Sequence, residues 1–115
     1  MRTLKQLTEK EGKIWAYLAN EEIWKAFLRQ AEEEGFRRGR GLSFDDIPFH
    51  WVMSLDRGME ICYVTLFNWT FSFAGEIEGT PLRIDYEKYK AGEEDYICRE
   101  AHFKRVSWEE KPLGI

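Results

Sequence analysis

Hydrophobic and polar positions recur with a clear period near the N-terminus, and the pattern predicts the first two elements. Thr3 and Gln6 have the spacing of a capping box, so a short helical turn is expected to end near Gly12. The next residues, 13–19, are apolar at alternating positions and aromatic between them, so both faces of the expected strand are hydrophobic. Such a strand belongs in the interior of a sheet that is covered on both sides.

The strongest helical pattern covers residues 20–34. Asn20 is a favourable N-cap, and Gly35 stands where the end of a helix accepts a left-handed residue. The apolar side chains of this segment form one stripe, made up of Ile23, Trp24, Phe27, Leu28 and Ala31. We expect this to be the main amphipathic helix of the protein, packed on one face of a sheet.

The middle of the chain predicts an antiparallel meander. Residues 36–48 follow neither a strand nor a helix period, which indicates a loop. Alternation resumes over 49–55, and the following Asp-Arg-Gly at 56–58 is typical of a tight hairpin turn. A return strand is expected over 59–65, and a third strand over 69–75 is expected from the alternation of aromatic and small polar residues.

The last part of the chain predicts a short helix and a final strand. Gly79-Thr80-Pro81 marks a turn, and Asp85 is a good N-cap for a helix over 86–90. Residues 96–108 are expected to supply a C-terminal strand. The whole pattern predicts an α+β fold with an antiparallel sheet of four to five strands: strand, helix, β-meander, short helix, C-terminal strand. A length of 115 residues suits a single domain, 1–115.

Composition places the chain among globular proteins. It is 43% hydrophobic and 33% charged, which fits neither a disordered chain nor a membrane protein. The first residues lack the apolar core of a signal peptide, and no segment reaches the ~20 apolar residues of a membrane span. We therefore expect a cytoplasmic protein with no membrane contact. Cys62 and Cys98 are then expected to be reduced thiols, although their pairing depends on geometry.

A loop with three arginines is the first candidate binding site. Arg37, Arg38 and Arg40 lie among glycines, and guanidinium groups with free backbone amides suit a small anionic ligand such as a nucleotide. The plainer interpretation is that these side chains pair with the preceding glutamates or keep the loop solvated. Nucleic acid is not expected as a partner, because the net charge is −4 and the basic residues form no continuous face.

Metal binding and catalysis find little support in the sequence. The histidines and cysteines are His50, Cys62, Cys98 and His102, and their spacing does not match a zinc site. A Cys62 nucleophile would need a neighbouring base, but pairing about the predicted turn places His50 opposite Val64. With no catalytic motif present, we expect a protein that is not an enzyme and that needs no metal or cofactor. A small enzyme with no recognisable motif is the third alternative, after the interaction protein and the binder of an anionic ligand.

The aromatic content of 16% is the most unusual feature of the composition. The predicted strands carry more aromatic surface than one helix can cover, so either the rest of the chain or a partner must cover the remainder. Aromatic residues are enriched at the centres of protein interfaces. The candidate protein-interaction residues, which would contact a host protein or a second copy in a homodimer, are Trp51, Trp69 and Phe71 with the acidic Glu76 and Glu78.

Four segments, 13–19, 32–36, 59–64 and 83–89, give the sequence a resemblance that covers most of the chain. They resemble small uncharacterised accessory proteins of phages and conjugative elements in Gram-positive gut bacteria. The resemblance implies a binding role, such as modulation of a host enzyme, counter-defence or sequestration of a signalling ligand. Its motifs are structural and transfer no catalytic residue. The arginine-rich loop is more basic than the usual pattern, which keeps the anionic-ligand alternative open.

Overall fold

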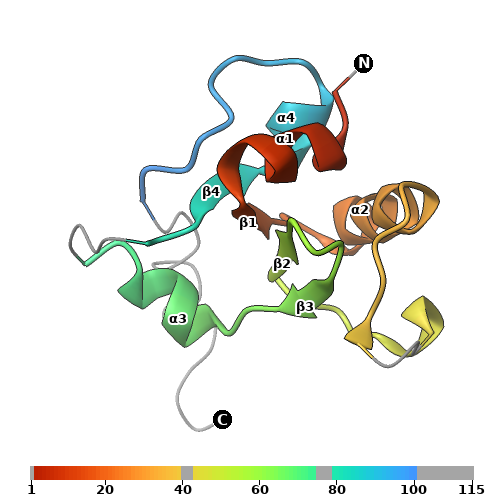
Figure 1. Ribbon diagram of the computed structural model, residues 1–115. Coiled ribbons are helices and arrows are strands. Elements are labelled where there is room, and N and C mark those ends of the chain that lie inside the picture. Colours follow the sequence, from red (N-terminus) through yellow and green to blue (C-terminus); the bar gives the residue numbers. More distant parts are fainter. Residues whose placement is uncertain (1, 40–42, 75–78, 101–115) are drawn as a thin grey trace, which may run out of the picture.

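A four-stranded mixed sheet forms the centre of the protein (Figure 1). The computed structural model describes residues 2–39, 43–74 and 79–100. The strand order is β3-β2-β1-β4, and the strands are β1 (Lys13–Tyr17), β2 (Val52–Asp56), β3 (Ile61–Tyr63) and β4 (Leu82–Asp85). The predicted α+β class is confirmed. The expectation of a wholly antiparallel sheet is wrong, because β4 runs parallel to β1 while the other pairs are antiparallel.

The parallel strand follows from the path of the chain. After β3, at one edge of the sheet, the chain forms α3 (Leu66–Phe71) and then reaches the opposite edge of the sheet at β4. It enters β4 from the end at which β1 also begins, with Ile14 opposite Leu82 and Tyr17 opposite Asp85. A long connection of this kind can deliver a parallel strand, whereas a tight hairpin can deliver only an antiparallel one.

The helical turn predicted to end near Gly12 and the helix predicted over 20–34 are confirmed together with their caps. In α1 (Leu4–Glu11), the Gln6 N–H donates to Thr3 Oγ1 at 3.0 Å and the Thr3 N–H donates to Gln6 Oε1 at 3.1 Å. In α2 (Glu21–Glu33), the Ile23 N–H donates to the Asn20 side chain. The helix ends before Gly35, whose φ of 98° lies in the left-handed region.

The predicted third strand over 69–75 is wrong, since most of that segment belongs to α3 and the turn after it. The N–H of Asn68 donates to Thr65 Oγ1 at 3.1 Å, so Thr65 caps a helix at this point. Leu66, Trp69 and Phe73 pack against the sheet with the i, i+3, i+7 spacing of a helix. The segment therefore contains both a strand-like alternation of aromatic and small residues and the spacing of a helix, and the structure follows the helical spacing.

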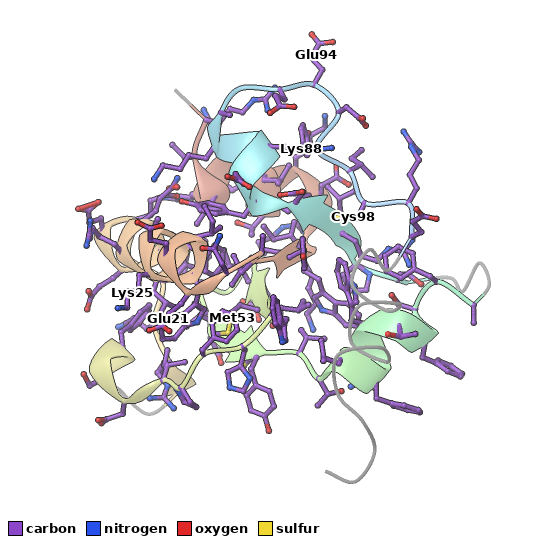
Figure 2. The ribbon with its side chains drawn as sticks, turned by 180° about the vertical axis from the view of Figure 1, so that it is seen from behind. Glu21, Lys25, Met53, Lys88, Glu94 and Cys98 are labelled. Atoms are coloured by element: carbon purple, nitrogen blue, oxygen red, sulfur yellow. The ribbon has the colours of Figure 1, made fainter. Side chains whose placement is uncertain are left out.

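The two faces of the sheet are covered by different helices (Figure 1). One face packs against α1, α2 and the short helix α4 (Tyr86–Lys90), which was predicted at these residues. Met53 points from β2 into this larger core and is 1% exposed (Figure 2). The other face packs against α3, and its buried residues are Val52, Val64, Trp69 and Cys98. The aromatic side chains of β1 lie partly buried on this second face, so much of the aromatic content is core.

The hairpin between β2 and β3 has a register that differs from the prediction. Val64 lies opposite Val52, to which its N–H donates at 2.9 Å, so the expected pairing of His50 with Val64 is wrong. The reason is that the turn lies one residue later than predicted, over 57–59, with the Asp56 N–H donating to the Glu60 C=O at 3.2 Å. Met59 takes the left-handed φ of 66° within that turn. Moving the turn by one residue shifts the return strand by two positions.

A chain of polar contacts connects the helices on the first face. The Tyr86 hydroxyl donates to Gln30 Oε1 at 2.6 Å, and Gln30 Nε2 donates to Glu34 Oε2 at 2.7 Å. The Glu34 carboxylate in turn accepts the N–H groups of Leu4 at 3.1 Å and Lys5 at 2.8 Å. These bonds satisfy free donors at the start of α1 and tie α1, α2 and α4 together.

The expected C-terminal strand over 96–108 is visible only at its beginning. Ile97 forms an isolated antiparallel bridge with Ile84 of β4, and the Cys98 N–H donates to the Arg83 C=O at 2.8 Å. The rest of that prediction lies outside the described residues. Along the described part of the chain, the structure contains no helix with the length and apolar character of a membrane span.

Candidate functional site

Two phenylalanines of α3 are among the most exposed large apolar side chains of the described surface. Phe67 is 73% exposed and Phe71 is 56% exposed, and the others of this kind are Tyr63 at 60% and Ile97 at 37%. The two phenylalanines lie one helical turn apart. Their rings are stacked, with centroids 5.9 Å apart and planes inclined by 23°. Phe67 and Phe71 are called the aromatic pair below.

The helix that carries the aromatic pair is short but firmly attached. A helix of this length is not stable alone in water, so it depends on tertiary contacts. Trp69, which is 0% exposed, provides the main contact and stacks against Tyr17 of β1 at a centroid distance of 6.2 Å. After the helix, the Arg83 guanidinium lies 3.9 Å from the centroid of the Phe73 ring. The same group donates to the C=O of Ser72. The aromatic pair is therefore presented on a fixed support.

The predicted interaction residues occupy different places in the structure. Trp69 is buried on the side of α3 that faces the sheet, so its ring belongs to the core and not to the outer surface. Trp51 is partly buried and meets Phe49 edge to face at 5.0 Å. Phe71 is exposed on α3. Glu76 and Glu78 lie outside the described residues.

Phe67 was not among the predicted interaction residues. Its signal is the i, i+4 spacing to Phe71, which places both rings on one side of a helix. That spacing has this meaning only if the segment is helical. Because 69–75 was predicted as a strand, this spacing did not identify Phe67 as a partner of Phe71.

The arginine-rich loop is only partly described. Arg37 is exposed, and its backbone pairs with the turn before β3, with its N–H donating to the Met59 C=O at 2.8 Å. The Arg38 guanidinium donates to the C=O of Ser43 at 2.7 Å and so holds the loop. Arg40 lies outside the described residues. The other charged side chains include an exposed helical ion pair in α2, in which Lys25 Nζ lies 3.4 Å from Glu21 Oε1 (Figure 2).

The structure separates the candidate catalytic residues. The His50 ring stacks on Tyr63 at 4.5 Å, and burial lowers the pKa of His50 below its ordinary value. Cys62 follows the opposite alternation from Tyr63 in β3, so its side chain lies on the other face of the sheet. Within the described ranges, no three His, Cys, Asp or Glu side chains gather in a way that could hold a metal ion. His102 is outside these ranges.

The two thiols have very different surroundings. Cys62 is exposed on β3, and Cys98 is buried beside β4, at the opposite edge of the sheet (Figure 2). With neighbouring strands about 4.8 Å apart, this separation is far above the ~7 Å that a disulfide allows. Burial, with a smaller contribution from Asp85, raises the pKa of Cys98 to about 12. Both cysteines are free thiols in the structure.

Native thiol labelling is predicted to be restricted to one cysteine. We expect iodoacetamide near pH 8 to add a single group to the folded protein, at Cys62, because the buried Cys98 forms almost no thiolate. Addition of denaturant should allow a second group to react. Mass spectrometry of the intact protein and its peptides measures both steps, and modification of Cys98 at the rate of Cys62 without denaturant would contradict the packing described for the second face.

In comparisons with known proteins, no family model, no curated protein and no solved structure matches this chain.

Proposed function

We propose that this protein is a non-catalytic interaction protein and that it binds another protein through the aromatic pair on α3. The observation that carries this proposal is the pair itself: two stacked phenylalanine rings, 73% and 56% exposed, on a helix fixed by a buried tryptophan. Scattered single apolar residues are normal on a protein surface, but aromatic side chains held together on a rigid support are typical of interface centres.

The chemistry of α3 indicates the kind of surface that would cover it. The helix sequence Leu-Phe-Asn-Trp-Thr-Phe contains no charged residue. Complete burial of one phenylalanine side chain stabilises a complex by about 1.5–3 kcal/mol, so covering both rings would supply a useful part of the binding free energy. A complementary surface would be apolar at its centre and free of carboxylates there, because a buried carboxylate facing these rings would lose its hydration without a partner.

The resemblance to accessory proteins of mobile elements supports a host protein as the partner. A counter-defence or modulating role in the host cytoplasm would then consist of occupying that protein. Binding of a small anionic ligand by Arg37, Arg38 and Arg40 has less support, because Arg38 already donates to the Ser43 C=O.

Affinity capture from the cytosol of a Gram-positive bacterium tests the proposal. Three forms of the full chain would be immobilised: the unmodified protein, the Phe67→Ala/Phe71→Ala variant, and Ile97→Ala as a control. Ile97 is also an exposed apolar residue, at 37%, but it lies beside β4 and not on α3. We expect a protein that the first and third forms retain and that the double variant retains at least about tenfold less, which corresponds to ~1.4 kcal/mol.

The double variant should fold normally, because substitutions of exposed side chains usually change stability little. Matched thermal unfolding curves would show this. Equal retention of every captured protein by all three forms would contradict a binding role for the aromatic pair.

A further inference from the structure

β3, the strand that precedes α3, lies at an edge of the sheet. The N–H and C=O groups of its successive residues point alternately toward β2 and away from the sheet. The Val64 N–H donates to the Val52 C=O, so Val64 and also Cys62 turn their backbone groups toward β2. The alternate residues, Ile61 and Tyr63, turn their N–H and C=O groups away from β2, toward the open edge.

A short piece of chain covers the first part of this edge. The Ile61 N–H donates to the Arg37 C=O at 3.0 Å, and the Arg37 N–H donates to the Met59 C=O at 2.8 Å. This contact is a single parallel bridge and does not continue as a strand. Along the part of the chain that the structure describes, the outward C=O of Ile61 and the outward N–H and C=O of Tyr63 have no hydrogen-bond partner.

The side chains around these backbone groups suit an extended apolar segment. β3 has the sequence Ile-Cys-Tyr and contains neither a charged residue nor a proline, the residues that commonly protect an edge from pairing. Tyr63 is 60% exposed on one face of the strand, and Cys62 is exposed on the other. An added strand would therefore place its alternate side chains beside Tyr63 on one face and Cys62 on the other.

We propose that the partner presents a short, uncharged extended segment that pairs with the outward backbone groups of Ile61 and Tyr63 as an additional strand. This inference rests on the proposed function and specifies how the partner is recognised: main-chain hydrogen bonds at the edge supply affinity, and alternate apolar side chains supply selectivity. The aromatic pair follows β3 directly in the chain and provides a second contact for the same partner.

Two substitutions at one position separate the backbone contribution from that of the side chain. Tyr63→Pro removes the outward N–H and leaves the inward bonds of Cys62 and Val64 in place, which is the arrangement in which an edge strand tolerates proline. Tyr63→Ala removes the ring and keeps the N–H. The probe is a phage-displayed library of random peptides of about seven residues, a length that can form such a strand.

We expect selection on the unmodified protein to enrich uncharged peptides with β-branched or aromatic residues at alternate positions. Their affinity should fall at least about tenfold on Tyr63→Pro and only a few-fold on Tyr63→Ala. Absence of enrichment, or equal binding to Tyr63→Pro, would overturn the proposal. In a third outcome, the peptides still bind Tyr63→Pro but no longer bind the Phe67→Ala/Phe71→Ala variant. This result would overturn pairing at the edge and would still support the proposed function.

Thermal unfolding of Tyr63→Pro shows whether the variant keeps the fold. If it does not fold, amide hydrogen exchange in the unmodified protein gives the decision with the same enriched peptides. Pairing at the edge predicts that a bound peptide slows exchange of the Tyr63 N–H at least about tenfold, which reports a new hydrogen bond of that group. An unchanged exchange rate with peptide bound would overturn the proposal.

Discussion

Replacement of Trp69 by alanine is expected to lower the free energy of unfolding by about 3–5 kcal/mol, the usual cost of removing a large aromatic side chain from a core. Trp69 is 0% exposed, and among the described residues the other buried members of the cluster on the second face are Val52, Val64 and Cys98. Loss of the ring leaves α3 without its principal contact. Since small domains have a total stability of only about 5–15 kcal/mol, this change should be severe.

Urea unfolding measures the loss, and labelling of Cys98 reports its location. Because Cys98 shares a cluster with Trp69, Trp69→Ala should make the thiol of Cys98 reactive in the native state. Phe71→Ala is the matched control, since it removes an aromatic ring from the outer side of the same helix and should cost less than about 1 kcal/mol. Similar losses in the two variants would show that Trp69 does not anchor α3.

Alkaline pH is expected to destabilise the fold strongly. Burial, with a smaller contribution from Asp85, raises the pKa of Cys98 from 9.0 to about 12, and burial followed by Glu34 raises the pKa of Tyr86 from 10.0 to about 12. In the unfolded chain both groups lose their protons first, so the unfolded state binds fewer protons above about pH 9 and stability falls as pH rises. At 1.36 kcal/mol per pKa unit, the loss by pH 12 is about 3–6 kcal/mol.

Urea titrations at a series of pH values from neutral to about 12 measure this dependence. Cys98→Ala should flatten the curve from about pH 9 upward, and Tyr86→Phe should flatten it from about pH 10 upward. The comparison uses the slopes, because each substitution also shifts the whole curve through lost contacts. Unaltered slopes in both variants would contradict the burial of these two groups.

Local signals predicted much of the fold. The capping box at Thr3 and Gln6, the N-cap Asn20 with Gly35, and the N-cap Asp85 each predicted a helix that the structure contains. These features succeed because the atoms that form them lie within a few residues of one another. β1 was also predicted correctly as a strand with two covered faces, which the packing of separate helices on its two sides explains.

The features that could not be predicted depend on contacts between residues that are far apart in the sequence. The parallel pairing of β4 with β1 depends on the path that α3 gives to the chain, and a four-residue strand contains no information about its neighbour. The alternation in 69–75 predicted a strand, whereas the structure forms α3, capped by Thr65, and packs Leu66, Trp69 and Phe73 on the sheet. The proposed interaction surface therefore keeps the predicted Phe71, adds Phe67 and leaves out Trp69, which is buried.

The proposed function requires a partner to cover the aromatic pair when it binds. Hydroxyl-radical footprinting of the captured complex measures this, because the reaction rate of each aromatic ring follows its exposure to solvent. We expect Phe67 and Phe71 to react quickly in the free protein and at least about threefold more slowly in the complex, as burial at an interface centre requires. Unchanged rates at both rings, with protection at another surface of the protein, would contradict the proposed function.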